Sequence, residues 1–423
     1  MENAYVGLHA PNGAISLTVE NTTFESNEAP LGLHVNLIGN LSSLDFSGND
    51  DSFIWTALNA PVEGVNTEQT WPAFDVPYRA YNTIHINTLL TLSPGVTVEF
   101  SQNQGIDISG DGRLSASGSS DNPITLTGVE DQRGFWAGLY YHDTQSSDNV
   151  LEYVTVENAG GAQWTGSSSS KGGIFVRGAG VALDISNSTF RENATAGLHS
   201  WDGGATLSIS SSNFESNDLP LWVPANHVGQ IAADNTFSDN DDSYVLIGAQ
   251  GWLGDDQTWE NLDVHYRAQA TVAVNAALTI APGTTLAFEQ DVGLKVEGDG
   301  TLSADASGGD KIEFIAANGE TLNGYWYGLG IFTLSSTNVI KNADILYGGG
   351  KRWTGSPATV ANVFLSNNDD AGHVAMEDVH IAGSGKYGIN IRADSTIEPC
   401  SNVTFDNNDD DNIHGSGTFA CNN

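Results

Sequence analysis

Four segments of the sequence combine neighbouring Asp and Asn residues, a combination that could bind a hard cation. Adjacent carboxylate and amide oxygens suit Ca²⁺, which takes six to eight oxygen ligands. None of these segments has the spacing of an EF-hand loop or of a calcium-binding Gly-Gly-x-Gly-x-Asp repeat, so solvated turns are the competing interpretation. The predicted metal ligands are Asp50, Asp51, Asp239, Asp241, Asp242, Asp369, Asp370, Asp409, Asp410 and Asp411.

Two Trp-Thr-Gly segments, at 164–166 and 353–355, lie in stretches rich in Gly and Ser and close to basic residues. Loops displayed by a rigid scaffold are where binding residues collect. An exposed indole suits a sugar face, and Arg binds a carboxylate through two hydrogen bonds. Loop packing is the competing interpretation, since a duplicated scaffold also duplicates its structural residues. The predicted glycan-binding residues are Trp164, Lys171, Lys351, Arg352 and Trp353.

The histidines form no recognisable catalytic set in the sequence. His9 and His199 recur in equivalent positions, and His142 lies beside Asp143 and two tyrosines. No spacing of partners indicates zinc or a nucleophile triad, so these histidines are interpreted as structural or surface residues. Acid–base carboxylate pairs contributed by distant segments remain an open alternative.

Composition excludes several classes of partner. The 423 residues include 14 Lys and Arg against 52 Asp and Glu, a formal net charge of −38. Such a charge repels nucleic acid and anionic lipid, so neither is expected as a partner. No stretch approaches the roughly 18–20 apolar residues of a membrane span, and no membrane insertion is expected. A hydrophobic share of 39% is enough for a core.

The two cysteines, Cys400 and Cys421, enclose a short segment near the end of the chain. This arrangement predicts a disulfide and an oxidising compartment. The first residues lack the basic start and apolar run of a signal peptide. The chain is therefore expected to be extracellular or on the cell surface, with its export signal outside this sequence.

The sequence repeats itself with an offset of about 188 residues. Trp71-Pro-Ala-Phe-Asp-Val-Pro-Tyr-Arg79 returns as Trp259-Glu-Asn-Leu-Asp-Val-His-Tyr-Arg267, and Trp164-Thr-Gly returns as Trp353-Thr-Gly. Self-similarity of this kind indicates duplicated repeats. The predicted organisation is 1–69 as the back end of a repeat, 70–257 as one repeat, and 258–423 as a second repeat with a C-terminal cap, in one continuous solenoid. Because the sequence starts within a repeat, two alternatives are open: the chain is cut from a longer repeat protein, with parent-chain contacts at its N-terminal edge, or it has a natural open edge suited to end-to-end contacts.

Short segments that alternate apolar and polar residues fill each repeat. Examples are Ile124-Thr-Leu-Thr127 and Val181-Ala-Leu-Asp-Ile-Ser186, which are rich in residues that favour strands. Clusters of Gly, Asn, Asp and Ser separate them and favour turns. No run at helical spacing exceeds two turns, so the chain is predicted to be all-β.

A recurring phrase places Phe three residues before Asn, as in Thr23-Phe-Glu-Ser-Asn27, Thr189-Phe-Arg-Glu-Asn193 and Phe214-Glu-Ser-Asn217. This pattern resembles secreted bacterial right-handed parallel β-helix proteins of the pectate-lyase-like superfamily, as does the Leu-Thr-Leu-Ser-Pro-Gly-Val-Thr-Val-Glu-Phe segment that ends at Phe100. The resemblance covers essentially the whole chain. It implies a right-handed parallel β-helix of duplicated repeats with Asn ladders at its turns, closed at the C-terminus by the disulfide cap.

The resemblance also raises the question of catalysis, because the superfamily includes polysaccharide lyases and glycoside hydrolases. The sequence has no Arg-x-Pro-x-x-Arg resembling the lyase signature and no Arg-x-Lys of the hydrolases. Ile413-His-Gly-Ser-Gly417 only partly resembles their Gly-His-Gly turn. A non-catalytic structural or adhesive role is therefore the leading prediction, with a polysaccharide or cell-surface glycan as partner and Ca²⁺ as the one candidate cofactor. A polysaccharide-degrading enzyme is the alternative.

Overall fold

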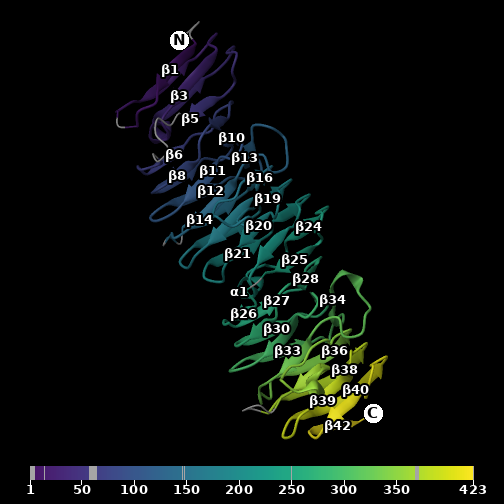
Figure 1. Ribbon diagram of the computed structural model, residues 1–423. Helices are drawn as coiled ribbons and strands as arrows, with labels where there is room; N and C mark the ends of the chain where they lie inside the picture. Colours follow the sequence, from purple (N-terminus) through teal and green to yellow (C-terminus); the bar gives the residue numbers. More distant parts are fainter. Residues whose placement is uncertain are drawn as a thin grey trace. The chain divides into compact units, whose positions relative to one another are not determined.

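The alternating segments form short parallel strands, as the sequence predicts. The computed structural model describes residues 5–13, 15–56, 64–144, 146, 148–248, 250–366 and 371–422. Every pair of strands whose register is described runs parallel, and Figure 1 shows such rows, for example β10, β13, β16 and β19. The chain folds as a parallel β-helix, which confirms the predicted fold class.

The chain divides into two units. Unit 1 comprises Met1–Trp222 and Asp234–Ser243, and unit 2 comprises Val223–Ala233 and Tyr244–Asn423. Each unit is described separately below.

Unit 1 contains three long rows of strands, apart from the short pair β2 (Val19–Thr23) and β4 (Leu41–Asp45). The ten-stranded sheet consists of β1 (Val6–Ala10), β3 (Ala29–Leu33), β5 (Ile54–Thr56), β7 (Tyr78–Ala80), β10 (Thr97–Phe100), β13 (Ile124–Gly128), β16 (Val154–Glu157), β19 (Thr189–Arg191), β22 (Asn213–Glu215) and β24 (Thr236–Ser238). The six-stranded sheet consists of β6 (Gln69–Trp71), β9 (Leu89–Leu92), β12 (Arg113–Ser117), β15 (Asn149–Glu152), β18 (Ala182–Ser186) and β21 (Thr206–Ser210). The third sheet consists of β8 (Ile84–Ile86), β11 (Gly105–Ile108), β14 (Gly138–His142), β17 (Ile174–Arg177), β20 (Leu198–Ser200) and β23 (Leu221–Val223), the last at the unit boundary.

Unit 2 repeats this arrangement. Its seven-stranded sheet consists of β26 (Trp252–Leu253), β29 (Val272–Val274), β32 (Gly293–Val296), β35 (Gly328–Ile331), β37 (Ala361–Leu365), β39 (Tyr387–Ile391) and β41 (Ile413–Gly415). A second row consists of β25 (Tyr244–Ile247), β28 (His265–Ala268), β31 (Thr285–Phe288) and β34 (Ile312–Ala316), and a third of β27 (Gln257–Trp259), β30 (Ala277–Ile280) and β33 (Thr301–Asp305). Both rows reach β36 (Val339–Leu346), which is followed by β38 (His373–Ala382), β40 (Thr396–Asp406) and β42 (Thr418–Asn422).

Several coils turn a corner at a single residue in the left-handed conformation. Between the six-stranded and ten-stranded sheets of unit 1 this residue is Asn187 in one coil (φ 50°) and Ser211 in the next (φ 49°). The same position in unit 2 lies inside the long strands, at Asn342 (φ 48°) and Asn402 (φ 49°). Asn tolerates this conformation better than most residues do. The turn clusters read from the sequence are therefore corners of the coils.

A second turn carries the predicted asparagine ladder. In unit 1 the Asn193 side chain donates to the Oδ1 of Asn217, and Asn217 donates to the Oδ1 of Asn240, both at 3.0 Å. These buried amides also accept backbone N–H groups, as Asn217 does from Asn193 at 3.1 Å. Because the Asn repeats once per coil, each amide satisfies the turn of the neighbouring coil.

The core of each unit contains an equivalent aromatic stack. Trp136 stacks on Phe100 at 4.3 Å in unit 1, and Trp326 stacks on Phe288 at 4.4 Å in unit 2. Both indoles are fully buried and donate to a backbone carbonyl, at 2.7 and 2.6 Å respectively. Both tryptophans therefore belong to the core of their unit.

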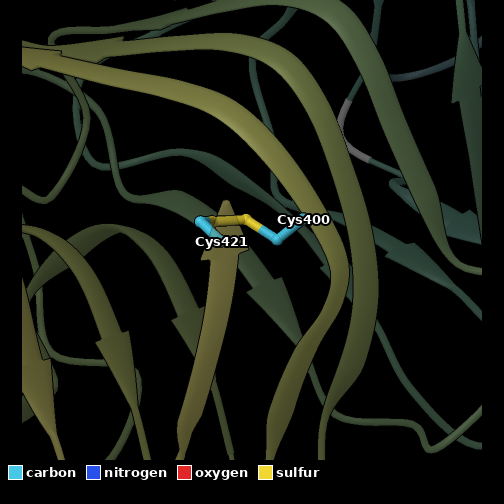
Figure 2. The surroundings of a disulfide bond; sticks show 2 residues. All are labelled: Cys400 and Cys421. Atoms are coloured by element: carbon cyan, nitrogen blue, oxygen red, sulfur yellow. A yellow bond between two sulfur atoms is a disulfide. The ribbon is translucent and has the colours of Figure 1, made fainter. Parts of the chain in front are cut away.

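The disulfide joins Cys400 and Cys421, which are paired residues on the neighbouring strands β40 and β42 (Figure 2). Their Cα atoms are 4.2 Å apart, and their sequence separation is 21. A covalent link between the last two strands of the row limits the unfolding of this end of unit 2. The predicted disulfide is confirmed.

Helical turns are short. They comprise α1 (Ala225–Val228) and the 3₁₀ turns η1 (Val35–Asn40), η2 (Ala317–Gly319) and η3 (Pro357–Thr359). Two of them are anchored in a similar way. The Gln69 side chain accepts from the backbone N–H of Gly39 within η1, and the Gln257 side chain accepts from the backbone N–H of Gly229 at the end of α1, both at 2.9 Å. Across the residues described, no helix has the length and apolar character needed to cross a membrane.

Candidate functional site

The outward side chains of the third sheet of unit 1 form a single row with unusual chemistry. The register pairs His85 with Asp107, Asp107 with Tyr140, and Tyr140 with Phe175. It then continues through His199 to Trp222. We call this set the outer row; it comprises His85, Asp107, Tyr140, Phe175, His199 and Trp222.

The charged end of the outer row is a chain of alternating imidazoles and carboxylates. The Asp107 carboxylate contacts the Nδ1 of His85 at 3.3 Å through one oxygen and the Nε2 of His142 at 2.9 Å through the other. The Nδ1 of His142 in turn contacts Asp143 at 3.1 Å. His142 enters the group because it lies two residues after Tyr140 on β14 and so points to the same side of the sheet. Four titratable groups are thus linked in sequence.

Their environment shifts two of these groups in opposite directions. Burial alone would raise the pKa of Asp107, but hydrogen bonds from His142 and His85 lower it to about 2. The hydrogen bond to Asp107 raises the pKa of His142 above its usual value, against the opposing effect of partial burial. The contact therefore favours the ionised carboxylate of Asp107 beside the protonated imidazole of His142.

Aromatic rings surround this chain. Tyr140 stacks on His142 at 4.1 Å, on Trp164 at 5.3 Å and on Phe175 at 5.4 Å. Burial raises the pKa of its hydroxyl, although the Arg177 guanidinium counteracts this shift. Tyr140 thus connects the charged end of the row to its aromatic end.

At the aromatic end, Phe175 and His199 are buried although they face outward. His199 stacks on Trp222 at 4.2 Å, and Trp201, which is 38% exposed, meets Phe175 edge-on. Burial lowers the pKa of His199 to about 4, and its Nδ1 contacts the carbonyl of Lys171 at 3.2 Å. His199 is thus a neutral donor, as its structural interpretation predicts.

The Trp-Thr-Gly loop places Trp164 over this row. The loop closes through Ser170. Its carbonyl accepts from the backbone N–H of Trp164 and its hydroxyl accepts from the backbone N–H of Thr165, both at 2.9 Å. The indole lies against Gly105, where a Cβ atom would come within 2.8 Å of the ring. Trp164 is half-buried, so one face of its ring packs on the sheet and part of the ring stays accessible.

Unit 2 builds the same loop on a different surface. The Thr354 N–H donates to the Thr359 hydroxyl at 3.1 Å, in place of Thr165 and Ser170. The half-buried Trp353 stacks on Tyr327 at 4.2 Å and lies against Gly330, where a Cβ would come within 2.9 Å of the ring. The row beneath this loop comprises Ala273, Lys295, Gly330, Phe364, Asn390 and His414.

The basic residues predicted to bind glycans have local roles. The Lys171 ammonium donates to the Gly161 carbonyl at 3.1 Å. Lys351 pairs with Asp291 at 3.0 Å, and the carbonyl of Arg352 accepts from the Tyr327 hydroxyl. The Lys351 and Arg352 side chains are exposed. Both remain beside Trp353, whereas Lys171 is committed to its own loop.

The predicted metal ligands are dispersed over several turns. Asp241 pairs with Arg133 at 2.6 Å, and Asp409 accepts from the Asn323 amide at 2.7 Å. In the residues for which the structure gives positions, no group of three or more His, Cys, Asp or Glu side chains is arranged to hold a metal ion. The remaining candidates lie on turns at Asp50, Asp51, Asp239, Asp242, Asp410 and Asp411, whereas Asp369 and Asp370 lie outside the described residues. Calcium binding stays a prediction.

Sequence reasoning missed the group around Asp107. His85, Asp107 and His142 are 22 and 35 residues apart, and only the strand register brings them together. One signal was present: the second repeat has Lys295 in place of Asp107, Gly330 in place of Tyr140 and Phe332 in place of His142. Side chains that differ while the scaffold is retained are not required by the fold.

Comparisons with protein-family models, with curated proteins and with solved structures found no match to this chain.

Proposed function

We propose that this chain is a non-catalytic, extracellular or cell-surface β-helix protein that binds glycans through its two Trp-Thr-Gly loops. The observation that carries the proposal is the repeated geometry of the indoles. In each unit a loop of the same hydrogen-bonding pattern holds a half-buried Trp against a glycine and beside a tyrosine ring. An aromatic platform of this kind suits the apolar face of a sugar.

The choice of Trp at these positions argues for more than packing. The Nε1–H groups of Trp164 and Trp353 are both buried and have no hydrogen-bond partner in the described structure. A buried donor without a partner costs about 1–3 kcal/mol, and Phe would fill space without that cost. The presence of Trp in both loops, on two otherwise different surfaces, supports a binding role for the indole ring.

The disulfide supports an extracytoplasmic location, since such bonds persist in oxidising compartments. The resemblance to secreted pectate-lyase-like proteins agrees with this location, and the relationship itself is part of the proposal. Because one fold carries many functions, the argument for glycan binding depends on the loops.

A polysaccharide-degrading enzyme is the second candidate, and the Asp107–His142 pair favours it. An imidazole with a raised pKa, beside a tyrosine and a guanidinium, resembles an acid–base site for a carboxylated sugar. However, both ring nitrogens of His142 are held by carboxylates, at 2.9 and 3.1 Å. Neither nitrogen is free to exchange a proton with a substrate in this arrangement, so binding is the better-supported function.

Screening the purified chain against acidic and neutral polysaccharides, with and without Ca²⁺, distinguishes the two functions. Affinity electrophoresis measures retention, while reducing ends and absorbance of unsaturated products measure cleavage. The proposal predicts retention by at least one polysaccharide without products. Product formation would favour the enzyme, and absence of retention from every polysaccharide in the panel would contradict glycan binding.

A further inference from the structure

A second polar feature of unit 1 shares no residue with the outer row. Between β13 and β14 the chain forms an arch, residues 129–136, beside the ends of β16, β19 and β22. A hollow of about 610 Å³ lies here. Its walls carry four carboxylates and two guanidiniums, from Asp131, Glu157, Glu192, Glu215, Arg133 and Arg191.

The arch is firmly anchored, so the hollow is preformed. Arg133 donates to the carbonyl of Ser216 at 2.5 Å and contacts Asp218 at 2.8 Å and Asp241 at 2.6 Å. The next residues of the arch bind back to the wall, because the Phe135 N–H donates to the Asn158 carbonyl at 2.8 Å. A binding site that is already ordered avoids the entropy cost of forming a wall when the ligand arrives.

The two guanidiniums leave part of the negative charge uncompensated. Arg191 donates to Glu157 at 2.7 Å, and Arg133 lies 3.5 Å from Glu192 in addition to its other partners. Within the described residues, neither Asp131 nor Glu215 forms an ion pair. The lining of the hollow therefore carries a formal charge of −2, four carboxylates against two guanidiniums.

A buried amide of the lining lacks a donor. Asn158 is 4% exposed, and its Nδ2 donates to Asp131 at 3.2 Å, which directs the side chain toward the acidic wall. Its Oδ1 has no hydrogen-bond partner in the described structure. A buried acceptor without a donor is unfavourable, and a ligand with N–H or O–H groups would supply one.

Unit 2 retains the arch but loses most of the charged residues that line the hollow of unit 1. Asn323 takes the place of Arg133 and donates to Asp409 at 2.7 Å and to the Asn407 carbonyl at 2.9 Å. Glu157 and Asn158 become Leu346 and Tyr347, while Arg191 and Glu192 become Ala382 and Gly383. The Tyr347 ring lies where a Cβ on Gly383 would come within 2.5 Å of it. Asp406 stands in place of Glu215. The arch thus docks without the other five charged residues of the lining, so the fold does not require them.

We propose that this hollow binds a small ligand through a primary ammonium group, such as an amino sugar or a short aliphatic diamine. An ammonium has three donors and no acceptor, which matches Asp131, Glu215 and the free Oδ1 of Asn158. The volume is within the range of small-molecule sites and far exceeds that of a bare ion. The absence of a metal-binding arrangement among the described residues agrees with an organic cation.

Isothermal titration calorimetry at low salt tests this proposal with two amines, glucosamine and 1,4-diaminobutane. Glucose and 1,4-butanediol are the matched controls without charge, and CaCl₂ tests a bare cation. We expect saturable binding of at least one amine, none of the uncharged compounds, and weaker binding in 0.5 M NaCl because salt screens partly exposed charges. Which amine binds identifies whether the site takes an amino sugar or a linear diamine.

Two variants tie the binding to the hollow. Glu215→Gln removes one charge without breaking a described ion pair, and Asn158→Gly removes the free oxygen at a position of φ 64° that glycine adopts without strain. Each should weaken amine binding about fivefold or more. Glu152→Gln, on β15 in the six-stranded sheet, is the control and should bind like the wild type.

Binding of glucose as tight as that of glucosamine, amine binding unchanged in both variants, binding of Ca²⁺ alone, or no heat from any amine would each overturn the proposal. Thermal unfolding of each variant establishes that it is folded. This site is separate from the Trp-Thr-Gly loops, so its failure would leave glycan binding untouched.

Discussion

The two units keep the same framework while their surfaces differ. The Phe100–Trp136 stack of unit 1 returns as Phe288–Trp326 in unit 2, with almost the same separation and the same indole hydrogen bond. By contrast, Asp107 of the outer row is replaced by Lys295 in the seven-stranded sheet. The difference separates side chains that the fold requires from those that it merely displays.

The largest effect should come from the shared core. Trp136→Ala and Trp326→Ala each remove a fully buried indole and leave a cavity, which typically costs about 3–5 kcal/mol. Thermal and urea unfolding of both variants would measure the loss. Because the stacks are equivalent, the two losses should be similar. A loss below about 1 kcal/mol in either variant would contradict the claim of a shared structural core.

In the arch, Arg133 of unit 1 can be replaced by the residue that unit 2 has at the equivalent position, Asn323. Arg133→Ala removes the contacts to Asp218, Asp241 and the Ser216 carbonyl, and should cost about 1–2 kcal/mol because the network is partly exposed. Arg133→Asn introduces the residue that unit 2 uses here and should cost less, since Asn323 makes two of the equivalent hydrogen bonds.

Urea unfolding of the two Arg133 variants would measure this difference. If Arg133→Asn proved as destabilising as Arg133→Ala, the two arches would not be equivalent in the way described.

The smallest effect concerns the pH dependence of stability. The hydrogen bond to Asp107 raises the pKa of His142 in the folded state. Its contribution is therefore fully present below about pH 6.5, the pKa of an unperturbed histidine, and is lost as the pH rises through the folded value. His142→Phe introduces the counterpart residue of unit 2, Phe332, and removes the group whose stabilising effect is lost as the pH rises. The melting temperature of the variant should therefore fall less than that of the wild type between pH 6 and 8.

His199 contributes in the opposite sense. Burial lowers its pKa to about 4, so its contribution is present above about pH 6.5 and is lost as the pH falls toward 4. His199 is present in both the wild type and the His142→Phe variant, so its contribution cancels when their pH profiles are compared. Identical pH profiles for the wild type and His142→Phe would show that the Asp107–His142 contact does not contribute to folding.

The framework could be predicted from the sequence because its signals are local or periodic. Alternation within segments such as Ile124–Gly128 predicts strands, and the cysteine spacing predicts the disulfide. The recurring Phe and Asn carry the resemblance that implies the ladder. These features depend on which residues recur, and they do not require knowledge of the register between coils.

The surface groups could not be predicted in this way because the coils differ in length. Thr155 pairs with Thr189, 34 residues later, whereas Asn213 pairs with Thr236, only 23 residues later. No fixed spacing therefore reveals the outward column Thr97, Thr125, Thr155 and Thr189, in which each threonine is paired with the next. Arg133 contacts Asp218 and Asp241, which lie 85 and 108 positions later in the sequence, and these contacts are hidden for the same reason.

The central claim is that equivalent Trp-Thr-Gly loops in both units bind glycan, and affinity electrophoresis with the polysaccharide retained by the wild type tests it most directly. The double variant Trp164→Ala/Trp353→Ala should lose at least about tenfold in affinity, as removal of a large aromatic anchor typically does. Trp252→Ala, which removes a 59% exposed indole outside these loops, is the matched control and should be retained normally. Melting temperatures establish that all variants are folded. Retention of the double variant equal to that of the wild type would contradict the account.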